Sequence, residues 1–113
     1  MQLSEFVKNY YLHDSFFEKI KYDEKEHVVV MLINFAFWMQ SDYQSDDPET
    51  GIIKVVFHEV TGFTCSSEID INAVSILETY LNDDTINFLL MNDMTDDSLN
   101  IYITASYVEV CSI

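Results

Sequence analysis

Three consecutive residues, His13-Asp14-Ser15, supply the residue types of a hydrolase triad. In such a triad the histidine takes the proton of the serine nucleophile, and the aspartate orients the histidine. Side chains of consecutive residues diverge, so this tripeptide cannot adopt that geometry by itself. We therefore predict a structural corner between a helix and a strand. His13 would lie near the negative end of the helix dipole, and Asp14 or Ser15 would bond to free backbone N–H groups of the turn.

The histidines and cysteines are the candidate metal ligands. His13, His27 and His58 lack the i, i+4 spacing of a helical zinc motif, and Cys65 and Cys111 lack the Cys-x-x-Cys spacing. The acidic segments lack the Asp-x-Asp-x-Asp-Gly pattern of a calcium loop. We interpret the cysteines as buried thiols and expect neither a metal nor another cofactor. A metal protein or enzyme that uses His13 and His58 with nearby acids is kept as an alternative.

Few other catalytic routes are open to this sequence. It contains two glycines and no arginine, so it has no glycine-rich phosphate loop, no Gly-x-Ser-x-Gly elbow and no guanidinium clamp for a substrate. A carboxylate pair such as Asp14 and Glu59 is a conceivable acid and base couple, but among twenty acids chance proximity is expected. The sequence therefore predicts no enzymatic activity.

The charge balance is the most informative feature of the composition. Twenty acidic residues stand against five lysines, which gives a formal net charge of −15. Lysine and arginine are the residues that bind phosphate backbones and anionic lipid surfaces, so we expect no nucleic-acid partner and no membrane partner. A cationic protein is the favoured partner. The alternative is that the acidity only maintains solubility.

Two acidic segments are candidate partner-binding loops. Residues 40–51 contain the single proline and one of the glycines, and their length is typical of functional loops. Residues 82–97 contain two further acidic turns. The candidate partner-binding residues are Asp42, Tyr43, Asp46, Asp47, Glu49, Asp83, Asp84, Asp93, Asp96 and Asp97. Three aromatic residues, Trp38, Tyr43 and Phe63, flank the first loop. Exposed together, they would resemble the aromatic anchors of an interface. We favour the alternative, in which Trp38 lies in the core and only Tyr43 is outside.

The elements that position these residues are predicted from hydrophobic periodicity. The 113 residues, 49% of them hydrophobic, suit a single domain, 1–113. A one-sided apolar pattern predicts a helix with Ser4 as its N-cap and its end near His13. The predicted fold is mainly β (α+β), an antiparallel sheet or sandwich of about six strands behind this short N-terminal helix. The strands are expected at 16–22, 27–39, 52–61, 69–81, 86–91 and 99–110.

The assignment of residues 69–81 is ambiguous. Ile71, Val74, Leu77 and Leu81 also suit one face of a helix. We prefer a strand, because the acidic turn that follows would then close a hairpin with the apolar run 86–91.

Membrane and export signals are not found in this sequence. Its longest apolar run, residues 28–39, is shorter than the roughly 18 to 20 residues that span a bilayer. The first five residues have no basic region followed by an apolar stretch. We therefore expect a cytoplasmic protein.

The N-terminal third resembles a group of small bacterial proteins with a His-Asp-Ser corner. The likeness consists of a helix, His13-Asp14-Ser15, then Phe16, Ile20 and Tyr22-Asp23, then a long apolar strand, and it covers about the first forty residues. Some of these proteins look like immunity proteins of toxin systems. The resemblance implies a chain that occludes a toxin, and an acidic surface would complement a cationic nuclease by mimicking its phosphate substrate.

Three hypotheses follow. The first is a non-catalytic inhibitor that binds a basic protein, such as a cationic toxin, through the acidic loops with Tyr43 as an aromatic contact. The second is a self-associating module, a homodimer through an exposed edge of the last strand. The third is the metal protein or enzyme that uses His13 and His58.

Overall fold

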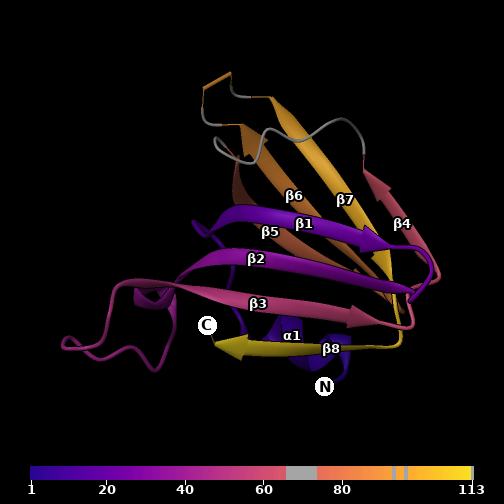
Figure 1. Ribbon diagram of the computed structural model, residues 1–113. Coiled ribbons are helices and arrows are strands. Elements are labelled where there is room, and N and C mark those ends of the chain that lie inside the picture. Colours follow the sequence, from indigo (N-terminus) through magenta and orange to yellow (C-terminus); the bar gives the residue numbers. More distant parts are fainter. Residues whose placement is uncertain (66–73, 93, 96, 113) are drawn as a thin grey trace.

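The computed structural model describes residues 1–65, 74–92, 94–95 and 97–112. In those ranges one α-helix accompanies eight antiparallel strands in one open sheet, ordered β4-β7-β6-β5-β1-β2-β3-β8 (Figure 1). The elements are α1 (Leu3–Asn9), β1 (Phe16–Asp23), β2 (Val28–Ala36), the 3-10 helix η1 (Phe37–Met39), β3 (Thr50–His58), β4 (Gly62–Cys65), β5 (Val74–Asn82), β6 (Thr85–Asn92), β7 (Ser98–Thr104) and β8 (Tyr107–Ser112). The mainly β class and the N-terminal helix are confirmed.

The predicted number of strands, about six, was too low because the chain bends at one corner of the sheet in two places. One bend lies between β3 and β4, and the other lies between β7 and β8. The pairing of β3 with β8 ends at His58 and Tyr107, and the pairing of β4 with β7 resumes at Gly62 and Thr104. Between them the Thr61 N–H donates to the Thr104 carbonyl at 2.9 Å. The corner therefore divides the single strand expected at 99–110 into two, and it adds β4, which was not predicted.

The sheet folds over on itself, as two phenylalanines show. Phe57 lies on β3 and Phe88 on β6, and β5, β1 and β2 stand between those strands. Neighbouring strands are about 4.8 Å apart, so a flat sheet would separate the two by about 19 Å. Their ring centroids are 6.1 Å apart in a T-shaped contact. The two halves of the sheet therefore face each other across one apolar core.

The helix α1 adds its apolar face to this core. Leu3 and Phe6 are buried, and the Phe6 ring packs edge-on against Phe57 with centroids 6.0 Å apart. The N-cap is Gln2, not Ser4, and the helix stops at Asn9, four residues before the predicted end. It stops because the next residue is already extended, which directs the buried Leu12 into the core.

The predicted hairpin of residues 69–81 with 86–91 is confirmed where the structure describes it. Residues 74–82 form a strand, not a helix, and Asn82 pairs with Thr85 across the acidic turn into β6. The remainder of the expected strand, 69–73, lies outside the described residues. The strand expected at 27–39 ends at Ala36, where η1 begins.

One of the two cysteines contradicts the prediction of buried thiols. Cys65 is half-buried, whereas Cys111 is exposed. Cys111 pairs in register with Lys54, which is also exposed, so both side chains lie on the outer face of the sheet near its β8 edge.

No helix in the described ranges is long and apolar enough to cross a bilayer.

Candidate functional site

The structure separates the acidic segments that the sequence grouped together. The loop 40–49 joins β2 to β3, and the turn that contains Asp97 joins β6 to β7 at the same end of the sheet, with β5 and β1 between them. Asp83 and Asp84 form the β5–β6 turn at the opposite end. Asp93 and Asp96 lie outside the described residues. The remaining candidates, Asp42, Tyr43, Asp46, Asp47 and Glu49, share one loop, which projects from the sheet in Figure 1.

The base of this loop is fixed by Gln40. Its amide nitrogen Nε2 donates to the carbonyl of Tyr11 at 2.7 Å and to that of Ala36 at 2.9 Å. Its oxygen Oε1 accepts the N–H of Tyr11 at 3.1 Å. At the far side of the loop the Trp38 N–H donates to the Glu49 carbonyl at 3.1 Å. These bonds tie both ends of the loop together and to the segment that follows α1.

The tip of the loop is closed by Asp47. Its carboxylate oxygen Oδ2 accepts the N–H of Gln44 at 3.0 Å, and its own N–H donates to the Gln44 carbonyl at 3.0 Å. The Tyr43 hydroxyl donates to the Asp47 carbonyl at 3.1 Å. This pattern, in which an aspartate side chain caps its own turn, holds a loop in one conformation. The loop is therefore arranged before any partner binds.

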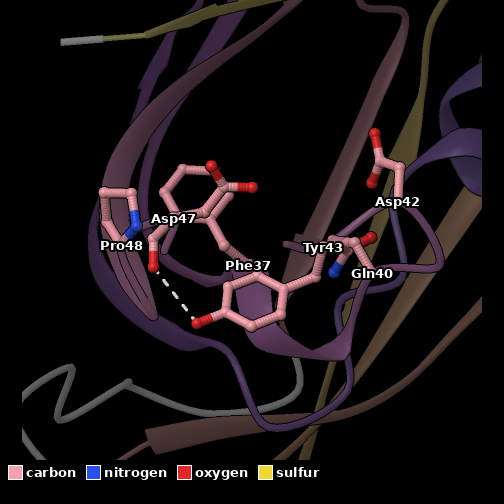
Figure 2. Close-up of a pocket in the computed structure, with 6 residues that line it drawn as sticks. All are labelled: Phe37, Gln40, Asp42, Tyr43, Asp47 and Pro48. Atoms are coloured by element: carbon pink, nitrogen blue, oxygen red, sulfur yellow. Dashed lines mark hydrogen bonds between the residues drawn. The ribbon is translucent and has the colours of Figure 1, made fainter. Parts of the chain in front are cut away.

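A cavity of about 300 Å³ lies between the base and the tip of the loop. Figure 2 shows the side chains around it: Phe37, Gln40, Asp42, Tyr43, Asp47 and Pro48. The Phe37 ring is held from behind by Phe35, with centroids 5.3 Å apart in a T-shaped contact. A second hollow of about 310 Å³ shares Phe37, Gln40 and Asp42 with this cavity. The first cavity is an apolar depression with carboxylates among its lining residues, and we call it the loop cavity.

The expectation that Trp38 lies in the core and only Tyr43 outside was wrong, because Trp38 is exposed and Tyr43 is half-buried. Trp38 is 46% exposed, whereas its neighbour Phe37 packs against the hydrophobic core. The reason is η1, which replaces the last part of the predicted strand and turns the chain after Ala36. Phe63, the third aromatic residue considered with this loop, lies on β4 and contacts Tyr22 instead, with ring centroids 5.0 Å apart.

The carboxylates of the loop lack compensation by positive charge. Asp42, Asp46, Asp47 and Glu49 are all exposed, and none makes an ion pair with a residue that the structure describes. The sequence has no lysine between Lys25 and Lys54, so the loop carries only negative charge. Clustered carboxylates make the electrostatic potential around a surface strongly negative, which attracts cations from a distance.

The His13-Asp14-Ser15 corner supports this loop from below. The Ser15 side chain is fully buried, and its Oγ accepts the N–H of Ala36, the last residue before η1, at 2.9 Å. Asp14 has a left-handed φ of 65°, and its N–H donates to the Ile76 carbonyl at 3.1 Å. The His13 Nδ1–H donates to the Leu77 carbonyl at 2.7 Å. The three residues thus join β1 to β5 and to the end of β2.

A third hollow, of about 510 Å³, lies at the opposite end of the sheet. His27 and His58 both line it, because the Val60 N–H donates to the His27 carbonyl at 2.8 Å and so joins the two segments. The His58 ring stacks on Tyr107 with centroids 4.6 Å apart, and its Nε2 lies 2.5 Å from Glu109 Oε1. No sequence pattern indicated that His27 and His58 approach each other, since their approach depends on the corner that ends β3.

The combinations considered from the sequence are not assembled. His13 lies beside the start of β5, at the end of the sheet opposite to His58, and the same separation applies to Asp14 and Glu59. Across the described ranges, no group of three or more histidines, cysteines and acids is arranged to hold a metal ion.

Comparison with known proteins adds no assignment. No family model matches the chain, and neither the curated proteins nor the solved structures contain a significant match.

Proposed function

We propose that this protein is a non-catalytic acidic binding protein that holds a basic protein against the loop 40–49. The observation that carries the proposal is the loop cavity, an apolar depression that combines two aromatic side chains with uncompensated carboxylates. Interfaces concentrate their binding energy in aromatic anchors, and charges around the rim mainly accelerate association and select the partner. This loop offers both features on a backbone that hydrogen bonds hold in place.

The fixed shape of the loop strengthens the proposal. Ordering a mobile loop on binding costs free energy that subtracts from affinity. Here Gln40, Asp47 and Tyr43 already hold the loop through bonds of 2.7 to 3.1 Å. A solubility device needs negative charge but needs neither a closed turn nor an exposed tryptophan beside it.

The partner class that we propose is a cationic toxin, which makes the chain an immunity protein. Three features support this choice: the net charge of −15, the concentration of unpaired carboxylates on one loop, and the resemblance of the first forty residues to small bacterial proteins of that kind. A basic, nucleic-acid-binding surface on the toxin would be covered by carboxylates that occupy the positions of phosphates.

Affinity capture tests this function. The tagged protein is incubated with lysate of its own organism at low and then at high salt, and the bound chains are identified by mass spectrometry. We expect one basic polypeptide that is retained at low salt and released at high salt, because the Debye length falls from about 10 Å at 0.1 M salt to about 3 Å at 1 M, which weakens attraction between exposed charges. Retention of an acidic or neutral polypeptide that high salt does not release would contradict the proposal.

Self-association is a second candidate, and the position of β8 favours it. This strand lies at the end of the sheet order, and the exposed Cys111 lies on the outer face near that edge. Met1 already pairs with this edge at Val108. Its amino group donates to the Val108 carbonyl at 2.8 Å, and the Val108 N–H donates to the Met1 carbonyl at 3.0 Å. Sedimentation velocity separates the candidates. A monomer at high protein concentration excludes β8 pairing, and a dimer that dissociates when Val110 is replaced by proline supports it.

A further inference from the structure

We infer that the loop cavity accepts one arginine side chain of the partner protein. This inference rests on the proposed function and names the chemical group that the site recognises. The cavity of about 300 Å³ is at the small end of the range for ligand sites, so it suits one long side chain better than a cofactor or a folded segment.

The walls of the cavity suit a planar cation. Phe37 and Tyr43 supply aromatic faces, and Pro48 adds a further apolar surface (Figure 2). A guanidinium group stacks on aromatic rings and is attracted by their electron-rich faces. An ammonium group is more strongly hydrated, so its transfer into an apolar cavity is less favourable.

The carboxylates of the cavity complete the recognition. Asp42 is exposed and has no hydrogen-bond or ion-pair partner among the residues that the structure describes. Asp47 uses Oδ2 to accept the Gln44 N–H, which leaves its other oxygen for a ligand. A guanidinium group presents five donors in a fixed plane and pairs with carboxylates through two parallel bonds. The lysine ammonium group is a single point charge, so it cannot form the two parallel bonds that a guanidinium group makes with a carboxylate.

The direct test is a titration of ¹⁵N-labelled protein with two blocked tripeptides, Gly-Arg-Gly and Gly-Lys-Gly, followed by NMR. We expect the arginine peptide to shift the amide signals of residues 37–49 and to bind at least three-fold more tightly than the lysine peptide. Equal affinities, or shifts distributed over the acidic turns at both ends of the sheet, would overturn the inference.

Two substitutions at Tyr43 locate the binding. Tyr43→Ala removes the aromatic wall and should reduce arginine-peptide affinity at least five-fold. Tyr43→Phe keeps the ring, removes the hydroxyl that bonds to the Asp47 carbonyl, and should retain affinity within two-fold. If Tyr43→Ala binds as well as the parent, the inference is wrong. Circular dichroism and the unchanged NMR signals of β5 and β6 verify that both variants are folded.

The outcome separates this inference from the proposed function. If the natural partner is captured in a salt-dependent manner but Tyr43→Ala captures it equally well, the function stands and the arginine pocket does not. If the arginine peptide binds as described but no basic polypeptide is captured, the pocket stands and the proposed function fails.

Discussion

The Phe37 ring lies directly against the backbone of Gly51. A Cβ atom added to Gly51 would come within 2.7 Å of the Phe37 Cε2 atom, a distance that real Cβ contacts do not reach. The φ of Gly51 is not positive, so its backbone conformation does not require glycine. Glycine is needed there because a side chain would collide with the Phe37 ring. The first residues of β3 thus set the position of a cavity wall, and the loop cavity depends on this close approach.

The first prediction concerns this contact. Gly51→Ala should displace the Phe37 ring, lower the free energy of unfolding by about 1 to 3 kcal/mol and weaken arginine-peptide binding. Gly62→Ala is the matched control, because a Cβ there meets only the Thr104 side chain at 3.3 Å or more, and it should have the smaller effect on unfolding and none on binding. Urea unfolding and NMR titration measure the two effects. Equal behaviour of the variants would show that Phe37 moves aside freely.

The second prediction concerns the base of the loop. Gln40→Ala removes the three bonds to Tyr11 and Ala36 and should destabilise the protein by about 1 to 2 kcal/mol. Amide hydrogen exchange should accelerate in residues 38–47 and remain unchanged in β5 and β6. Gln44→Ala serves as the control, because the Gln44 side chain is exposed and only its backbone bonds to Asp47. Unchanged exchange in the Gln40 variant would mean that the loop is held by other contacts.

The third prediction concerns the corner. Ser15→Ala leaves the buried Ala36 N–H without its acceptor and should cost about 1 to 3 kcal/mol of unfolding free energy. Ser45→Ala, in the exposed part of the loop, should cost almost nothing. Thermal unfolding of the two variants provides the comparison. A Ser15 variant as stable as the parent would show that a different group accepts the Ala36 N–H.

The fourth prediction tests the folded-over sheet. The single variants Phe57→Leu and Phe88→Leu, with the double variant, should show a coupling of about 0.5 to 1.5 kcal/mol, as aromatic pairs in contact do. Additive effects would contradict the contact, because residues about 19 Å apart in a flat sheet do not couple. Phe88→Leu with Tyr102→Leu is the control pair. Tyr102 is 43% exposed, so the effects of these two substitutions on the free energy of unfolding should be additive.

Local patterns in the sequence predicted most of the strands and the amphipathic helix. Apolar residues alternate with other residues along β3, where Ile53, Val55 and Phe57 are buried and Lys54 is exposed. The hairpin between β5 and β6 followed from two apolar runs on either side of an acidic turn. These features depend on residues that are close in the sequence, and periodicity reports them well.

The corner at Ala105 and Ser106 was missed, although the sequence contains a signal for it. The buried positions Ile101, Ile103 and Ala105 are odd-numbered, whereas the buried Val108 and the partly buried Val110 are even-numbered, so the alternation shifts by one residue. A shift of this kind is what a bulge or bend produces. The convergence of His27 and His58 could not be predicted, because it depends on two separate bends of the backbone.

The candidate site was predicted in composition but not in shape. The acidic loop and Tyr43 were identified from residue types, whereas the cavity depends on the 3-10 turn at Phe37–Met39 and on its contact with Gly51. The same turn exposes Trp38. The separation of Asp83 and Asp84 from the loop follows from the strand order, which residue types do not encode.

The central claim is that a basic partner binds at the loop 40–49, and one comparison tests it most directly. Capture from lysate at low salt is performed with the parent protein and with two variants that lose the same number of negative charges. The loop variant carries Asp42→Asn, Asp46→Asn and Glu49→Gln. The control variant carries Glu24→Gln, Asp83→Asn and Asp84→Asn at the opposite end of the sheet. We predict that the basic polypeptide is retained by the parent and the control variant and lost from the loop variant. Equal retention by the two variants would contradict the claim, because total charge rather than this loop would then govern binding.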